Sequence, residues 1–320
     1  MQLTSLLFRL PIFGLDLGIA AALYYIVKKV ASVCDARLAS LVWFMNPYSF
    51  LSMELLGVPD VLATFFVVVV FAMLILRRPI LSGVFLGLGI WVKLYPILLL
   101  PTLLIFTHTD GVSRRDRFAV LCFSLIGLFG YLSWVIPSGT QYLTQFSPVT
   151  QPMPVFIGSY ITNSYGLVFI MILFYGLLGL FAKKTNSPIG LLLSTFLVYY
   201  VVSNPYPQFL TWAIPLMALD VAVNRSRAPI FAAFCGLAFA QWFLVSPALI
   251  TPSGYSLLMI PFVGNQLPWY SIAIGNFLDS PITGDLIIPI VSSSFYAVII
   301  FYAVDLMRAW FRLNSCDGTK

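Results

Sequence analysis

The chain has 320 residues, of which 60% are hydrophobic and only 9% are charged, and it carries a net charge of +6. Its mean hydropathy of +0.98 excludes a soluble domain, and its continuous apolar runs, which lack the alternation of β-strands, exclude an outer-membrane barrel. We therefore expect an all-α, polytopic integral membrane protein. The cations cluster in short segments between apolar runs, so the positive charge does not indicate nucleic-acid binding.

Long uncharged runs, separated by polar or proline-containing breaks, predict about ten or eleven transmembrane helices in a single transmembrane domain over residues 1–320. The pair at 80–92 and 95–107 is close enough to form one broken element. In chain order, the expected helices lie near residues 11–27, 38–56, 60–76, 80–92, 95–107, 118–136, 165–182, 188–202, 206–223, 229–250 and 286–307.

The distribution of cations predicts the topology. Fifteen of the seventeen Lys and Arg residues fall at one end of the expected helices, and only Arg9 and Lys93 do not. The positive-inside rule places that end, with the C-terminus, in the cytosol and the N-terminus on the non-cytosolic side. Because no span precedes residues 1–9, we also expect a further helix and outer loop upstream of Met1.

Lys93 is the charge that most needs an explanation, because an ionisable residue inside a membrane is costly and is a functional candidate by default. The helix expected at 80–92 would reach about 20 Å, against a hydrocarbon core of roughly 30 Å. Lys93 should therefore lie in the outer half of the membrane, near a helix break. Its ammonium could bind a phosphate, or it could reach the lipid headgroups along its own stem. Tyr95 beside it could be an interfacial aromatic residue.

Three acidic residues are further candidates. Asp60 follows Gly57-Val58-Pro59 and opens a helix, so it is either an N-cap or a carboxylate at an outer cavity, and Glu54 lies in the same region. Asp16 lies inside an apolar helix, where it could become neutral, pair with a buried partner or line a polar cavity.

Gln208 and Trp212 are one helical turn apart, so they share a face that could bind a sugar or could pack against a neighbouring helix. The four cysteines are scattered and His108 is the single histidine, so no metal site is predicted. None of the eleven acidic residues has Asp-x-Asp or Glu-x-Asp spacing.

Several short motifs occur in order along the N-terminal third: Asn46-Pro47, Gly57-Val58-Pro59-Asp60, Arg77-Arg78-Pro79, Gly83 to Gly87, and Lys93-Leu94-Tyr95-Pro96. In this order they resemble the multi-pass GT-C glycosyltransferases, which use polyprenyl-phosphate-linked sugars. The first mannosyltransferase of GPI-anchor synthesis and its archaeal relatives are the most similar group. Together with Asp16-Leu17 and the Gln208 to Pro215 segment, the resemblance spans residues 11–107 and about 203–217.

The resemblance implies a mannosyltransferase that moves a sugar from a dolichyl- or polyprenyl-phosphate donor to a lipid-linked glycan acceptor on the non-cytosolic face. Some members use a divalent cation, and no other cofactor is expected. The catalytic base would lie upstream of Met1. The implied roles are as follows: Lys93 and Tyr95 contact the donor phosphate; Asp60, Glu54, Gln208 and Trp212 contact substrate; Asp16 and Asn46 are structural polar residues.

Two other functions remain open at this point. One is a non-catalytic GT-C-like subunit that binds a lipid-glycan beside a partner subunit, as in the related component of the GPI transamidase. The other is a transporter or flippase, for which broken helices would also serve, although the two halves show no repeat. The membrane would be the plasma membrane of an archaeal or other prokaryotic cell, or the endoplasmic reticulum of a eukaryotic one.

Overall fold

The computed structural model of the protein describes residues 2–46, 49, 60–135, 164–181, 188–202, 207–245 and 286–316. Every regular element within these ranges is helical, so the prediction of an all-α polytopic membrane protein is confirmed. Three helical stretches are long and apolar enough to cross a membrane by themselves, and several shorter apolar helices pack among them. The three long stretches are Leu10–Val30, Arg114–Trp134 and Ile288–Arg308.

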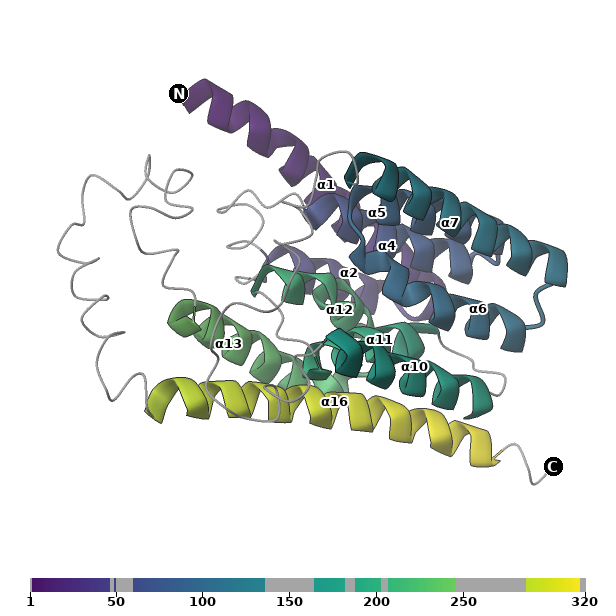
Figure 1. The fold of residues 1–320 in the computed structure, drawn as a ribbon. Coiled ribbons are helices and arrows are strands. Elements are labelled where there is room, and N and C mark those ends of the chain that lie inside the picture. The colour runs from purple at the N-terminus through teal and green to yellow at the C-terminus, as the bar shows by residue number, and fades with distance from the viewer. Residues whose placement is uncertain are drawn as a thin grey trace.

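The helices run side by side and alternate in direction (Figure 1). The N-terminus of α1 lies at one end of the bundle, and the C-terminal end of α16 lies at the other end. In order, the α-helices are α1 Gln2–Val30, α2 Val33–Phe44, α4 Asp60–Ile75, α5 Pro79–Val92, α6 Leu99–Thr109, α7 Arg114–Val135, α10 Ser164–Phe181, α11 Pro188–Val202, α12 Ile214–Val223, α13 Ala228–Val245 and α16 Ile288–Cys316.

Within the described ranges, three short 3-10 turns interrupt this pattern: η2 Tyr95–Leu98, η3 Pro207–Trp212 and η4 Arg225–Arg227. The first two divide segments that were predicted to be continuous, at 95–107 and 206–223. Proline explains both divisions, because its missing N–H is tolerated in the first turn of a helix but not in its interior. Pro96 lies in the first turn of η2, and Pro215 lies in that of α12.

The first two helices differ from the predicted segments at their ends. Helix α1 was expected to begin at Pro11, but it begins at Gln2 and continues through that proline. Helix α2 begins at Val33, five residues before the predicted start, because Ser32 and Asp35 form a capping box. It ends at Phe44, while the rest of the predicted segment beyond Asn46 lies largely outside the described residues.

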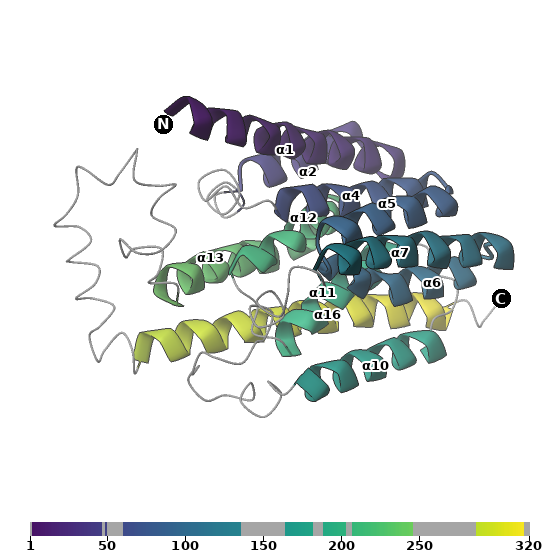
Figure 2. The same ribbon diagram turned by 45° about the horizontal axis from the view of Figure 1, so that its top comes forward.

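Helix α12 lies at the centre of the bundle. Every residue from Ile214 to Ala222 is buried, as expected for a helix that is apolar on all sides apart from Asp220. Helices α1, α2 and α11 contact it, and Figure 2 shows α1 and α2 at one edge of the bundle and α10 at the opposite edge. The segment that directly precedes α12 is η3, which therefore brings Trp212 into the protein interior.

Helices α5 and α7 approach each other closely through glycine. A Cβ atom added at Gly127 of α7 would lie 2.0 Å from the carbonyl oxygen of Gly87 on α5. A Cβ atom added at Gly87 would lie 2.3 Å from the carbonyl oxygen of Phe123. Small residues allow this kind of backbone contact between membrane helices, where no difference in hydrophobicity drives association. The glycines therefore fix the spacing of the α5–α7 pair.

Replacing Gly127 with alanine is expected to lower the free energy of unfolding by about 1–3 kcal/mol, because the added methyl group meets backbone and forces the two helices apart. The matched control is Gly176→Ala on α10, where an added Cβ meets nothing within 4 Å. That variant should be neutral or more stable by up to about 1 kcal/mol. Reversible unfolding in mixed micelles measures both, and equal effects at the two positions would contradict the close-contact explanation.

Candidate functional site

The candidate site lies at the break between α5 and α6. Helix α5 ends at Val92, and the next residue, Lys93, has an extended backbone with φ −155° and ψ 142°. The chain then turns through η2 before α6 begins. The predicted break beside Lys93 is therefore confirmed.

Lys93 forms an ion pair with Asp60, a residue that lies 33 positions earlier at the start of α4. The Asp60 side chain is only 1% exposed, whereas that of Lys93 is 24% exposed. A buried carboxylate requires a partner, since its transfer from water costs several kcal/mol. The second carboxylate oxygen of Asp60, Oδ2, accepts no hydrogen bond from the residues that the structure describes. The ion pair thus joins a buried carboxylate to a partly exposed ammonium group.

Two side-chain contacts join the break between α5 and α6 to neighbouring elements: a contact between two hydroxyl groups and a stack of two aromatic rings. The Thr64 hydroxyl donates to the carbonyl oxygen of Asp60 at 2.9 Å and lies 3.0 Å from the Tyr95 hydroxyl. The Tyr95 ring stacks on the Trp212 ring, with centroids 3.5 Å apart and planes 6° apart. The Lys93 ammonium lies 5.7 Å from the centre of that same Trp212 ring. We call these five residues the helix-break cluster.

The helix-break cluster unites four of the residues singled out in the sequence and adds one. Lys93, Tyr95, Asp60 and Trp212 lie together, while sequence reasoning missed Thr64. The available signal was its position one helical turn after Asp60, on the same face of α4. The contacts described here do not test the phosphate and sugar roles, which remain predictions.

The other candidate residues lie elsewhere or beyond the described parts. Asn46 is buried, accepts a hydrogen bond from the Ser49 amide and donates one to the Cys235 sulfur at 3.3 Å. Asp16 is buried within α1. Glu54 and the side chain of Gln208 fall outside the described residues. Within the described parts of the chain, no group of three or more His, Cys, Asp or Glu side chains could hold a metal ion.

The chemistry of the helix-break cluster follows from its charge balance. Asp60 compensates the Lys93 ammonium, so the pair is neutral as a unit. Tyr95 covers one face of the Trp212 ring, which is 2% exposed. The arrangement is therefore a closely packed, charge-balanced cluster in which Lys93, at 24%, has the more exposed side chain of the ion pair.

A second charged network joins α12, η4 and α16. The Arg227 guanidinium donates to Asp220 through Nη1 and to Asp305 through Nε, each at 2.7 Å. The Tyr302 hydroxyl also donates to Asp220, at 2.8 Å. Arg227, Asp220 and Tyr302 are buried, so the network fastens α16 to the centre of the bundle. Sequence reasoning identified none of these residues as a site.

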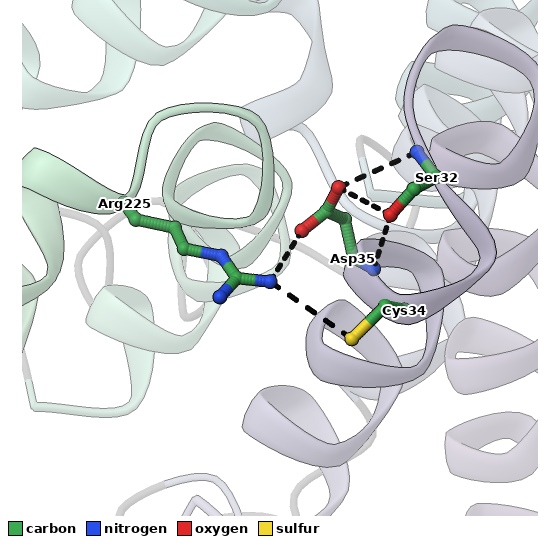
Figure 3. Close-up of polar contacts among 4 residues, drawn as sticks. All are labelled: Ser32, Cys34, Asp35 and Arg225. Carbon is green, nitrogen blue, oxygen red and sulfur yellow. Dashed lines mark hydrogen bonds and ion pairs between the residues drawn. The ribbon is translucent and has the colours of Figure 1, made fainter.

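A third network lies on the surface at the same end of the bundle (Figure 3). The Asp35 carboxylate accepts hydrogen bonds from the hydroxyl of Ser32 at 2.6 Å and from Arg225 at 2.7 Å. Arg225 also lies 4.0 Å from the Cys34 sulfur. The contacts join the α1–α2 turn to the α12–α13 turn, two cation-bearing turns that the predicted topology placed on one side. We call this end, which also includes the α4–α5 and α6–α7 turns, the cation-rich end.

The hydroxyl of Ser32, and after it Arg225, lowers the pKa of Asp35 below its ordinary value of 3.8. A depressed carboxylate pKa stabilises the fold above the ordinary value and loses that contribution as the pH falls through the lowered one. The difference in thermal midpoint between wild type and Asp35→Asn should therefore shrink between about pH 6 and pH 3. Thermal scans in detergent at several pH values measure it, and a difference that does not change with pH would contradict this origin.

The fold and the helix-break cluster define the class of the chain as a polytopic, all-α membrane protein with an ion pair at an interrupted helix. Comparison with known families adds one finding. The model of the family described as GPI transamidase subunit PIG-U matches residues 1–151. The match covers a little less than half of the chain and includes Asp60, Lys93 and Tyr95. No curated protein and no solved structure matches the chain.

The family match agrees with the predicted link to GPI-anchor biosynthesis at a coarse level. Its description is that of a transamidase subunit, so it supports the alternative of a non-catalytic subunit better than it supports the predicted mannosyltransferase.

Proposed function

We propose that this chain is a non-catalytic membrane subunit of a GPI-transamidase-type complex, in which it binds a lipid-linked glycan. The observation that carries the proposal is the Lys93–Asp60 ion pair, in a segment similar to a transamidase subunit. A glycosyltransferase that releases a lipid phosphate needs excess positive charge where that phosphate leaves. Lys93, whose charge Asp60 balances, supplies little of it. A neutral pair instead favours hydrogen bonds to sugar hydroxyl groups.

The proposal includes a location and an orientation. A GPI transamidase subunit resides in the endoplasmic reticulum membrane beside partner subunits. The cation-rich end would face the cytosol, in accordance with the positive-inside rule. Helix α5 begins at that end, and the helix-break cluster follows its other end, so the cluster would lie toward the luminal side, where a GPI glycan would be.

The test uses cells that lack their own PIG-U-type subunit. Expression of the tagged full chain should restore a GPI-anchored reporter at the cell surface, and the chain should co-purify with the other transamidase subunits. Purified chain in proteoliposomes with dolichyl-phosphate-mannose and a lipid-linked acceptor should transfer no mannose. Mannose transfer without restoration of the reporter would overturn the proposal and support the glycosyltransferase predicted from the sequence.

A further inference from the structure

A cavity of about 310 Å³ lies at the cation-rich end, between the ends of α4, α6 and α7. Leu74 and Phe106, each 7% exposed, form its apolar floor. Arg77, Asp110 and Asp116 supply charged groups around it. Pockets for small ligands measure about 300–1,000 Å³, so this volume suits a headgroup-sized ligand and not a nucleotide or a whole lipid.

Two helix ends of the same type stand beside each other at the cavity. The amide of Arg78 bonds to the carbonyl of Met73, and the amide of Val112 bonds to that of Thr107, which is the pattern of a Schellman turn. Each turn needs one residue with positive φ. The α6 turn uses Gly111, with φ 76°, whereas the α4 turn uses Arg77, with φ 54°.

The arginine at this position is unfavourable for the backbone. A side chain with a Cβ atom is strained in the left-handed region, and glycine would fill the position without strain. Strained residues of this kind occur where a function retains the side chain. At Arg77, the retained group is a guanidinium beside the cavity, 3.2 Å from the Asp110 carboxylate. The Arg77 side chain is 78% exposed, so this ion pair is weak and can be exchanged for another partner.

The charges around the cavity specify the ligand. One guanidinium and two carboxylates match a group that carries a phosphate and a cation together. Among the residues that line the cavity, the carboxylates of Asp110 and Asp116 outnumber the guanidinium of Arg77, which favours a ligand that carries an ammonium group. A choline headgroup cannot donate hydrogen bonds to carboxylates and is normally held by several aromatic rings, whereas Phe106 is the one aromatic residue among those that line this cavity.

We propose that this cavity binds the headgroup of a zwitterionic phospholipid with a primary ammonium group, namely phosphatidylethanolamine. Arg77 would hold the phosphate, and Asp110 and Asp116 would accept hydrogen bonds from the ammonium. The cavity lies where α4, α6 and α7 end, which is where membrane helices meet the headgroup layer. The site is separate from the helix-break cluster and does not depend on the function proposed for that cluster.

The test is the thermal midpoint of the full chain in detergent, measured with increasing dihexanoyl-phosphatidylethanolamine. The midpoint should rise, and an apparent dissociation constant follows from the titration. The dihexanoyl choline and serine lipids should bind at least tenfold more weakly. Equal or tighter binding of either one would overturn the proposal. Glycerophosphoethanolamine, which lacks acyl chains, distinguishes the source of the ligand. If only the lipid raises the thermal midpoint, the ligand comes from the bilayer. If both raise it equally, the cavity recognises the same headgroup in a soluble ester.

Two variants locate the site. Arg77→Gly removes the guanidinium and relieves the backbone, so it should fold and yet bind the ethanolamine lipid at least tenfold more weakly. Asp116→Asn should reduce the preference for ethanolamine over choline by a similar factor. The matched control is Asp35→Asn, another carboxylate in an exposed ion pair at the same end but outside the cavity, which should bind as wild type does. Wild-type lipid binding by both cavity variants would overturn the proposal.

Discussion

Replacing Lys93 with methionine is expected to lower the free energy of unfolding by about 3–5 kcal/mol, the range for removing one partner of a buried ion pair. The substitution leaves the carboxylate of Asp60, 1% exposed, without its cation. One of its oxygens, Oδ2, already accepts no hydrogen bond within the described part of the chain, so the loss of the cation adds to an existing deficit. Its place in the first turn of α4 offsets only part of the loss, through the helix dipole.

The partner variant provides an internal comparison. Asp60→Asn leaves a lysine that is 24% exposed, so its ammonium can turn toward polar surroundings, and the loss should be smaller than for Lys93→Met. The double variant should be more stable than Lys93→Met alone, because neither charge is then left unpaired. Reversible denaturation in mixed micelles gives the coupling energy of the pair, which should exceed about 1 kcal/mol. Losses that simply add would show that the two charges do not interact.

The same variants distinguish binding from folding. Because the double variant regains stability, its performance in the GPI-reporter assay reports on the ligand and not on the fold. If the ion pair contacts the glycan, the double variant should restore the reporter less well than the wild type does, even at equal protein abundance. Full restoration of the reporter would limit the helix-break cluster to a structural role, in which Thr64 and Tyr95 stabilise the break between α5 and α6.

The arrangement of the helices was largely predictable because membrane helices are specified by local features. An uncharged run of sufficient length predicts a span, and a proline or a polar cluster predicts its end. This reasoning placed α4, α5, α7, α10 and α11 within a few residues. It failed where a local signal was overlooked, as at the capping box of Ser32 and Asp35, which starts α2 early.

The candidate site was only half predictable. The cost of a charge in the membrane identified Lys93, and the position of Asp60 after a helix-breaking segment identified Asp60 separately, because both signals depend on each residue and its neighbours alone. Their pairing depends on how α4 packs against the end of α5, which the sequence of neither helix specifies. The same limit explains why Arg227 went unnoticed. Its partners Asp220 and Asp305 lie 85 residues apart in the chain on two different helices, and only the packed bundle brings them to one guanidinium.

Replacing Arg227 with methionine should be as damaging as the loss of Lys93, with a decrease of about 3–5 kcal/mol in the free energy of unfolding. The Arg227 guanidinium donates to both Asp220 and Asp305, and its removal leaves the buried carboxylate of Asp220 without a cation, whereas the side chain of Asp305 is 41% exposed. Tyr302 can still donate to Asp220, but one neutral hydroxyl cannot balance a buried negative charge. The expected consequence is that α16 separates from α12, and limited proteolysis should detect this separation before global unfolding.

Arg225 is the natural control, because it lies two residues away on the same short turn and also pairs with an aspartate. Its side chain is 62% exposed, compared with 8% for Arg227, so water can solvate Asp35 after Arg225→Met and stability should change little. Combining Arg227→Met with Asp220→Asn should restore part of the stability, since it removes the buried charge that the arginine had compensated. Equal losses for Arg225→Met and Arg227→Met would mean that burial does not decide the strength of these ion pairs.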